Sequence, residues 1–533
     1  MKILASALSI FHLLSFCGGY ESIHSYTPMS LVTDSAAIDQ DLHVIHLELK
    51  KETQRGWTNA EKIYREGAFS KPVAKILLNS PLEDDLPAKT TVKGVDTSGF
   101  PVSGTLFKEA KVDERELMIQ YDISEVQANY VNCQVGGNPA PNVGGCFNST
   151  GNLTVNGAVL PYDYDIYKHN VNERTIAHMS IDAEEKMWKC DNCPFPEYQM
   201  FYNYFGEFNY ADRILTHAFR GEQTYLKHGN MDFGYYTEYA LTEFLHKGMS
   251  YLNIWMWTIR QMEHALAECE ESKLDEGVHY WDEAVAFYTG SRSLIPNRDG
   301  NLIWHQAMLR CDEFMTCGPN ADQRDEEPYV NIEAFKHFNE GQLNIVNGKC
   351  KLARKNKERI VTMMLIPLIQ GNLRYSHIIA HEDKFYEKHG AEATLYALAT
   401  LPFVHDCNPK NAEIIYQNLK SKNTANVDYT AVKQAFEGTY ECLNIKCYEI
   451  GGIWEKSIND YKYDAFPCGL RDDTAFWMVI GGSAGGLVLL SIMGLVFLRM
   501  RRTKNTRAKT IESLEEGDME DIPIGGDSDK VIT

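Results

Sequence analysis

The spacing of hydrophobic and polar positions changes along the chain, and it predicts three kinds of region. Residues 35–80 carry apolar positions near helical spacing, interrupted at Pro72. Stretches such as TVKGVDTSGFPVSGTLF then alternate apolar with polar residues between turn formers, which predicts short strands. From about residue 165 to 450, long amphipathic runs such as YALTEFLHKGMSYLNIWMWTIRQMEHALAEC predict helices. We expect a mostly α protein with an N-terminal helical segment (20–84), a β-rich insert (85–160) and a helical-bundle ligand-binding region (161–474).

Two apolar runs near the ends of the chain have a different character. Residues 1–19 contain one lysine, an apolar run and then small residues, which is typical of a secretory signal peptide. Residues 475–498 carry no charge and are long enough, at about 1.5 Å per residue, to cross a bilayer as a helix. Basic residues follow directly in the segment 499–533, so the positive-inside rule predicts a cytoplasmic tail. We therefore expect a single-pass plasma-membrane protein with its N-terminus outside.

The cysteines are distributed as in a secreted protein. Of 13 cysteines, Cys17 falls in the signal peptide and the others lie in the exterior part, which predicts up to six disulfides. Cys133 and Cys146 are placed to clamp a hairpin of the insert, while Cys190 and Cys193 have the spacing of a local bridge. Glycans are predicted on a surface loop at two sequons, Asn148 and Asn152.

The helical region shows weak internal repetition. Stretches around 205–270 and 355–420 each read as helix, glycine-marked break and helix, and NAEKIY at 59–64 is similar to NAEIIY at 411–416. This pattern suggests a duplicated helical bundle. A ligand site is then expected between the halves, where facing helices contribute side chains.

Charge narrows the classes of partner. The chain has 52 basic and 73 acidic residues, a formal net charge of −21, and most of this excess lies in the exterior part. Such a surface repels nucleic acid and anionic lipid and raises the local concentration of cations. Simple solubility explains the same charge.

Tyrosine and aspartate gather in two stretches, PYDYDIY and FYNYFGEFNYAD. Phenolate and carboxylate are hard oxygen donors, and a tyrosine with a pKa near 10 gives up its proton only to a strong Lewis acid such as ferric iron. The alternative is that these tyrosines are amphipathic packing residues. The candidate metal donors from the two stretches are Tyr162, Asp163, Tyr164, Tyr210 and Asp212.

A third candidate is the helix predicted over HYWDEAVAFYTGS, residues 279–291. Helical spacing places His279, Asp282 and Glu283 along one stripe. The stripe could coordinate a cation, pair with an arginine or face solvent, and its bare spacing does not decide among the three.

Four stretches carry a resemblance to a known family. They are AEKIYREGAFS at 60–70, WDEAVAFYTGS at 281–291, FNEGQLNIVNGKC at 338–350 and IPLIQGNLRYSH at 366–377. Together, and in this order, they resemble the algal iron-assimilation and iron-starvation-induced proteins called phytotransferrins. The anchor and short tail are similar to the diatom-type surface receptor of that group.

The resemblance implies a receptor that binds ferric iron together with carbonate and delivers it by endocytosis, with release at acidic pH. Matched motif positions include Asp282, Glu283, Arg374 and Tyr375. By its chemistry Arg374 is the candidate for the anion, because a guanidinium fork matches the paired oxygens of carbonate. A plain helix salt bridge is the alternative for this arginine.

Other features concern partners and rival functions. The acidic stretch 511–529 of the tail is a candidate for binding endocytic adaptors or simply a solvated tail. Overlapping GxxxG pairs within 481–486 are candidates for a homodimer contact in the membrane. The alternative is that these positions simply hold small residues. Because the chain has no HExxH, GxSxG or Walker motif, we do not expect an enzyme, although a surface metal-dependent hydrolase is one rival. An adhesion or signalling receptor that uses no metal is the other.

Overall fold

The computed structural model describes most of residues 25–469. The described residues are 25–30, 32–67, 73–95, 99, 101–121, 150–163, 175–190, 192–290, 302–382, 387–420 and 426–469. The predicted signal peptide, the segment 475–498, the tail, Cys133, Cys146, Asn148 and Tyr164 lie outside them. Among the described residues, no helix is both long enough and apolar enough to span a bilayer.

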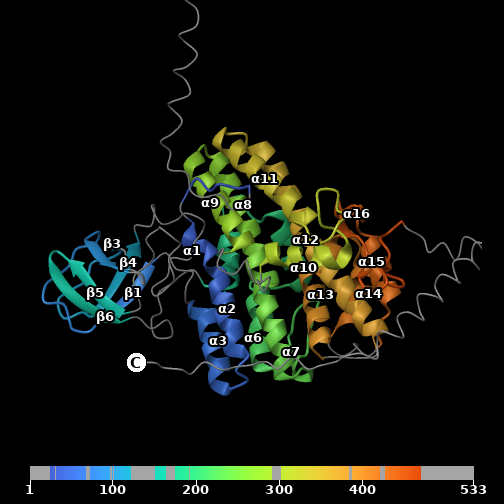
Figure 1. Cartoon of the computed structure of the whole chain (residues 1–533), viewed down its shortest axis with the longest axis horizontal. Helices are drawn as coiled ribbons and strands as arrows, with labels where there is room; N and C mark the ends of the chain where they lie inside the picture. Colours follow the sequence, from blue (N-terminus) through green and yellow to red (C-terminus); the bar gives the residue numbers. More distant parts are fainter. Residues whose placement is uncertain are drawn as a thin grey trace, which may run out of the picture. The chain divides into compact units, whose positions relative to one another are not determined.

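The β-rich part is a closed six-stranded antiparallel barrel (Figure 1). Its strands follow the order β1-β4-β3-β2-β5-β6, and β6 pairs with β1 to close it, as in the register Leu78↔Tyr162. The strands are β1 (Val73–Leu78), β2 (Thr91–Val95), β3 (Pro101–Leu106), β4 (Glu116–Tyr121), β5 (Thr150–Val155) and β6 (Ala158–Asp163).

Alternation along the strands explains the barrel core. In β3, Val102, Gly104 and Leu106 are buried while the residues between them are more exposed. Alternate residues of the other strands complete a separate apolar cluster, among them Ile76, Leu117, Ile119, Leu153 and Tyr162. The insert is therefore confirmed as β-structure, but its predicted start is wrong. Residues 73–78 were expected to be helical and form β1, because their backbone pairs with β4 and β6.

The rest of the described chain is a helical body, as predicted. Its first part contains α1 (Thr33–Ala36), α2 (Ile38–Leu49), α3 (Gln54–Glu66), α4 (His178–Ile181), the π-turn η2 (Glu184–Trp188), α5 (Pro196–Phe205), α6 (Tyr210–Arg220), the 3₁₀ turn η3 (Phe233–Tyr235), α7 (Glu238–Gly248), the π-turn η4 (Met249–Ile254) and α8 (Trp255–Glu270). It continues with α9 (Leu274–Thr289), α10 (Ile303–Phe314), α11 (Tyr329–Val346), α12 (Cys350–His381), α13 (Glu387–Cys407), α14 (Pro409–Leu419), α15 (Tyr429–Glu437), α16 (Cys447–Ile450) and a short hairpin, β7 (Trp454–Glu455) and β8 (Asp460–Tyr461). The duplication of this body stays a prediction.

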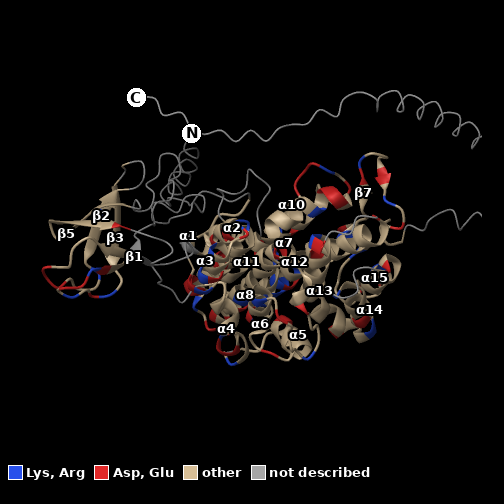
Figure 2. Ribbon diagram, turned by 90° about the horizontal axis from the view of Figure 1, so that it is seen from below, with Lys and Arg blue, Asp and Glu red and all other residues tan. Residues whose placement is uncertain are grey.

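Long helices pack side by side in the body. α8 lies against α9, α11 against α12, and α13 against α7, α12 and α14 (Figure 1). The shared core is rich in aromatic residues, with Trp255, Trp281 and Tyr198 fully buried. Acidic and basic residues are interspersed along the helices (Figure 2). Close packing leaves little tolerance, because a Cβ added at Gly341 of α11 would lie 2.1 Å from Cζ2 of Trp281.

Five disulfides are formed among the described residues, which confirms the oxidised cysteine framework. They join Cys190–Cys193, Cys269–Cys350, Cys311–Cys317, Cys407–Cys442 and Cys447–Cys468.

Candidate functional site

The carboxylate of Asp282 on α9 is buried and accepts several hydrogen bonds. Its Oδ2 accepts from the backbone N–H groups of Met29 and Ser30 and from the Ser30 hydroxyl, each at 2.8 Å. Its Oδ1 accepts from the Tyr26 hydroxyl and, at 2.8 Å, from Nε2 of Gln342. Burial raises the pKa of Asp282, whereas the hydrogen bonds from Tyr26, Ser30 and Gln342 lower it. In this arrangement Asp282 fastens the N-terminal segment to α9.

The other two members of the stripe contact the same part of the chain. Glu283 is buried and accepts hydrogen bonds from the hydroxyl of Ser35 at 2.8 Å and from the amide of Gln261. Nδ1 of His279 lies 3.1 Å from Oγ of Ser30. The hydrogen bonds of the stripe thus lead to the N-terminal segment, to α8 and to α11.

The Tyr/Asp donors predicted over 162–212 are divided between two cores. Tyr162 lies in the barrel core, and Asp163 is the last residue of β6. Tyr210 on α6 lies in the helical core, where its hydroxyl donates to the Leu252 carbonyl at 3.1 Å. Asp212 accepts from the Tyr64 hydroxyl at 2.9 Å. The structure therefore places these residues on separate elements, and none of their described hydrogen bonds leads to the α9 stripe.

Arg374 on α12, the predicted anion ligand, leads to a different cluster. Its Nε pairs with Oε1 of Glu313 at 2.7 Å, and its guanidinium carbon lies 5.0 Å from the centroid of the Tyr375 ring. Glu313 also pairs with Arg310 on the same helix, α10. The guanidinium carbon of Arg310 lies 5.8 Å from the centroid of the Tyr375 ring on α12.

Three tyrosines from different helices meet beside Arg310. The Tyr251 and Tyr396 rings stack with centroids 5.4 Å apart, and the Tyr375 and Tyr396 rings stack at 5.6 Å. Tyr251 belongs to η4, Tyr375 to α12 and Tyr396 to α13, and all three are buried. We call Tyr251, Arg310, Tyr375, Tyr396 and Lys247 the tyrosine–cation cluster.

Lys247 on α7 completes this cluster electrostatically. Its Nζ lies 3.0 Å from Oε2 of Glu243 and pairs with Glu392 of α13. Burial by itself lowers the pKa of Lys247, but Tyr375, Glu392 and Tyr396 outweigh it and the pKa is raised. Burial lowers the pKa of Arg310 in the same way, and Glu313 with the phenols of Tyr396, Tyr375 and Tyr251 raises it. Both cations therefore stay charged next to the phenols.

Burial has the opposite consequence for the tyrosines. It is the largest influence on Tyr251 and Tyr396 and raises the pKa of both well above that of free tyrosine. These phenols therefore keep their protons at neutral pH unless a strong Lewis acid displaces them.

Arg310 and two side chains next to the cluster, Gln306 and Glu392, have buried polar atoms that lack hydrogen-bond partners among the described residues. On α10, Nε of Arg310 and Nε2 of Gln306 are buried donors without an acceptor, while Oε1 of Gln306 accepts from Tyr251 at 2.7 Å. On α13, Oε2 of Glu392 is a buried acceptor without a donor. An unsatisfied buried polar group costs about 1–3 kcal/mol, so these atoms favour a ligand that offers both an anionic and a cationic part.

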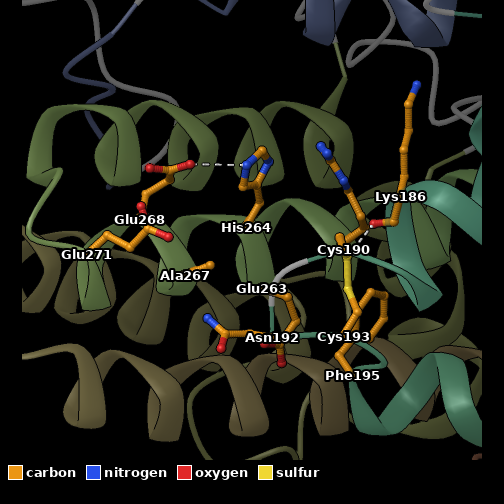
Figure 3. Close-up of a pocket in the computed structure, with 11 residues that line it drawn as sticks. Lys186, Cys190, Asn192, Cys193, Phe195, Glu263, His264, Ala267, Glu268 and Glu271 are labelled. Carbon is orange, nitrogen blue, oxygen red and sulfur yellow. Dashed lines mark hydrogen bonds and ion pairs between the residues drawn. A yellow bond between two sulfur atoms is a disulfide. The ribbon is translucent and has the colours of Figure 1, made fainter.

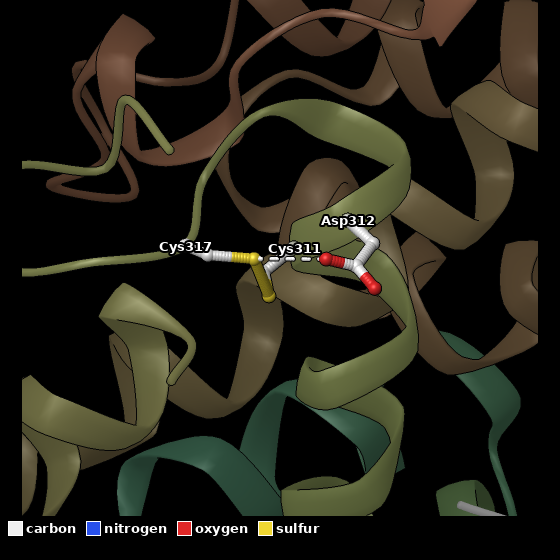
Figure 4. Close-up of side chains that lie close together, drawn as sticks. All are labelled: Cys311, Asp312 and Cys317. Atoms are coloured by element: carbon white, nitrogen blue, oxygen red, sulfur yellow. Dashed lines mark hydrogen bonds between the residues drawn. A yellow bond between two sulfur atoms is a disulfide. The ribbon is translucent and has the colours of Figure 1, made fainter. Parts of the chain in front are cut away.

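Two other groups of side chains are less suited to a metal ion. Cys311, Asp312 and Cys317 lie close together, but the two sulfurs form a disulfide and are not available as thiolates (Figure 4). Oδ1 of Asp312 accepts from the backbone N–H of Asp325 at 2.7 Å. This group therefore serves to close a loop.

The second group lines a cavity of about 140 Å³ beside the Cys190–Cys193 bridge (Figure 3). Its carboxylates already have cationic partners, since Glu263 pairs with Lys357 at 2.8 Å and with Arg354 at 2.9 Å. His264 lies 3.3 Å from Glu268 within the same helix.

Comparison of the chain with protein-family models, curated proteins and solved structures gives no match. The resemblance to phytotransferrins therefore rests on the sequence motifs.

The sequence patterns did not point to most of the tyrosine–cation cluster. Tyr375 stands in a motif that carries the resemblance, but Tyr251 and Tyr396 look like ordinary packing residues. One signal was available: Ile303, Ala307, Arg310 and Phe314 are all buried on α10, so a cation occupies an otherwise apolar stripe.

Proposed function

We propose that the helical body binds ferric iron together with carbonate at the tyrosine–cation cluster, and that the protein is a cell-surface receptor that delivers this iron by endocytosis. The observation that carries the proposal is the meeting of three buried phenols with two unpartnered donors, on Arg310 and Gln306. The site differs from the one expected on α9, where Asp282 and Glu283 already have protein partners.

The donor types suit ferric iron. Phenolate and carboxylate oxygens are hard ligands, and Tyr251, Tyr375, Tyr396 and Glu392 supply them here. Since burial raises the pKa of Tyr251 and Tyr396, a weak Lewis acid such as Ca²⁺ does not deprotonate these two phenols. The cluster therefore favours a small, highly charged ion.

The unpartnered donors suit a carbonate anion. Nε of Arg310 and Nε2 of Gln306 lie four residues apart on one helix and lack acceptors, and carbonate has oxygens to accept from both. Arg374, the residue predicted for this role, pairs with Glu313, which also holds Arg310. We assign Arg374 to positioning Arg310 and Arg310 to the anion.

The charges of the assembled site balance when two phenols lose their protons. Four cations, Arg310, Lys247, Arg374 and Lys388, lie near three carboxylates, Glu313, Glu392 and Glu243. Ferric iron with one carbonate adds a single positive charge, and loss of two phenol protons neutralises the total. Protonation of carbonate at endosomal pH removes the anion and weakens the site, because metal binding competes with protons.

The remaining parts of the proposal concern the location of the receptor. An acidic exterior raises the local concentration of cations, and the anchor and tail predicted over 475–533 place the binding region outside the cell. Adaptor binding by the tail is part of the same proposal.

A ferric titration of the full-length protein in detergent, with and without bicarbonate, tests the proposal. We expect a visible phenolate-to-iron absorption band that forms only with bicarbonate. Tyr396→Phe and Tyr375→Phe should remove or shift the band, whereas Tyr440→Phe, at a buried tyrosine on another face of the core, should keep it. Iron binding that survives both cluster variants would place the iron elsewhere, and no bound iron in either condition would favour an adhesion or signalling receptor.

A further inference from the structure

A second group of metal-binding side chains lies at a cavity of about 330 Å³ in the helical body. Tyr204 of α5, His228 of the loop after α6, His405 at the end of α13, and Glu413 of α14 line it. His228 and Glu413 are exposed, and His405 is half-buried, so the cavity is open to solvent. It shares no residue with the tyrosine–cation cluster.

The loop that carries His228 is held firmly by hydrogen bonds. The Asn230 side chain accepts from the Leu226 N–H and donates to the Leu226 carbonyl at 2.7 Å, which ties the two ends of the turn together. The Tyr416 hydroxyl of α14 donates to the Asn230 carbonyl at 2.7 Å. Gly229 has φ +71°, and an added Cβ would lie 3.1 Å from both Tyr204 and Phe205, so the turn requires glycine there.

The other imidazole is fixed from a helix. His405 lies on the last turn of α13, and the Cys407–Cys442 disulfide fastens the end of that helix. Both imidazoles are therefore presented from restrained backbone, as a metal site requires.

The separation of the two rings suits a shared metal ion. Their centroids are 5.4 Å apart, with 35° between the ring planes. A metal bound at about 2.1 Å from a ring nitrogen lies about 3.2 Å from the ring centroid, so this separation corresponds to a nitrogen–metal–nitrogen angle of about 115°, close to tetrahedral. No hydrogen bond to either imidazole is present among the described residues, which leaves their nitrogens available.

Tyr204 is a buried phenol at the same cavity. The Tyr204 hydroxyl keeps its proton, because burial, followed by Tyr416 and Glu413, raises its pKa. Lys227 donates to the Asn203 carbonyl at 2.9 Å and is therefore held by α5.

We propose that His228 and His405 bind a borderline divalent transition-metal ion such as Zn²⁺ or Cu²⁺, with water completing its coordination. Imidazole is a typical donor for these ions, whereas Ca²⁺ takes oxygen ligands. This site is independent of the proposed iron site: it is built on two imidazoles, whereas the iron site is built on three phenols.

Zn²⁺ titration of the full-length protein by calorimetry tests the proposal. We expect one Zn²⁺ per chain and a loss of affinity of at least about tenfold in both His228→Gln and His405→Gln. His217→Gln, on α6 and away from the cavity, is the matched control and should bind as the parent does. Ca²⁺ should not bind at the cavity. Thermal unfolding of each variant establishes that the substitution leaves the fold intact.

A second measurement uses the unaltered protein. Cu²⁺ bound at one equivalent should give an electron paramagnetic resonance spectrum with hyperfine splitting from two equatorial nitrogens. Splitting from none or one nitrogen, or Zn²⁺ affinity unchanged in both histidine variants, would overturn the proposal. Tyr396→Phe should leave Zn²⁺ binding unchanged, so failure of this site and failure of the iron site can be told apart.

Discussion

Replacement of Asp282 distinguishes an anchoring carboxylate from an iron ligand. Asp282→Asn keeps one carbonyl oxygen but places an NH₂ group opposite the Tyr26 and Gln342 donors or opposite the Met29 and Ser30 N–H groups. At least two of the hydrogen bonds are then lost. A hydrogen bond to a charged group contributes about 1.5–3 kcal/mol, and relief of the burial of the charge offsets part of this. We expect Asp282→Asn to lower the free energy of unfolding by about 3 kcal/mol.

Asp282→Ala removes every acceptor and leaves buried donors unsatisfied, so its cost should rise to about 5 kcal/mol. Urea unfolding followed by tryptophan fluorescence measures both losses. Limited proteolysis should show earlier cleavage near residues 25–36, because that segment loses its anchor on α9. Asp275→Asn, exposed in the first turn of the same helix, is the control and should change stability by less than about 0.5 kcal/mol.

A ferric titration of Asp282→Asn can refute the anchoring role of Asp282. If Asp282 is an anchor, the folded fraction of Asp282→Asn should keep the ferric absorption band. A loss of the band with unfolding free energy changed by less than about 1 kcal/mol would refute the anchoring role and restore the metal role predicted for α9.

Three further predictions concern stability. Gly341→Ala should cost about 3 kcal/mol and alter the near-ultraviolet circular dichroism, because its methyl group would overlap the buried Trp281 ring. Joint replacement of Cys269 and Cys350 by serine should cost about 4 kcal/mol in urea unfolding, since that disulfide closes a loop with a sequence separation of 81. Burial lowers the pKa of His264 from 6.5 to about 4, so the unfolded chain takes up the proton first as pH falls. The free energy of unfolding should therefore fall below about pH 6.5, by about 1 kcal/mol at about pH 5 after allowance for solvent screening. His264→Gln should flatten this dependence of stability on pH.

Periodicity predicted most of the secondary structure and failed where pairing partners lie far apart in the chain. Long amphipathic runs became α8, α12 and α13, and the alternating segment became strands. The exception is VAKILL at 73–78, a short apolar run whose spacing fits either a helix or a strand. Its state depends on β4 and β6, and nothing local in the sequence shows those partners.

The same limit explains what was found and missed at the candidate sites. The α9 stripe was singled out because acids and apolar residues share one helix, but its hydrogen-bond partners, Tyr26 and Ser30, come from the opposite end of the domain sequence. Of the tyrosines in those sequence clusters, Tyr162 and Tyr210 lie in two separate apolar cores. The tyrosines that meet, Tyr251, Tyr375 and Tyr396, come from three separate helices, so only the fold gathers them.

Lys357 is an example of a buried charge in the helical body whose role is structural. Lys357 is buried on α12, and its Nζ is paired at 2.6 Å with Glu197 and at 2.8 Å with Glu263. The same body leaves Nε of Arg310, Nε2 of Gln306 and Oε2 of Glu392 without hydrogen-bond partners among the described residues. Each such atom costs stability unless a bound ligand or water satisfies it. A ligand with both charges would satisfy these atoms, and the ferric carbonate that we propose carries both.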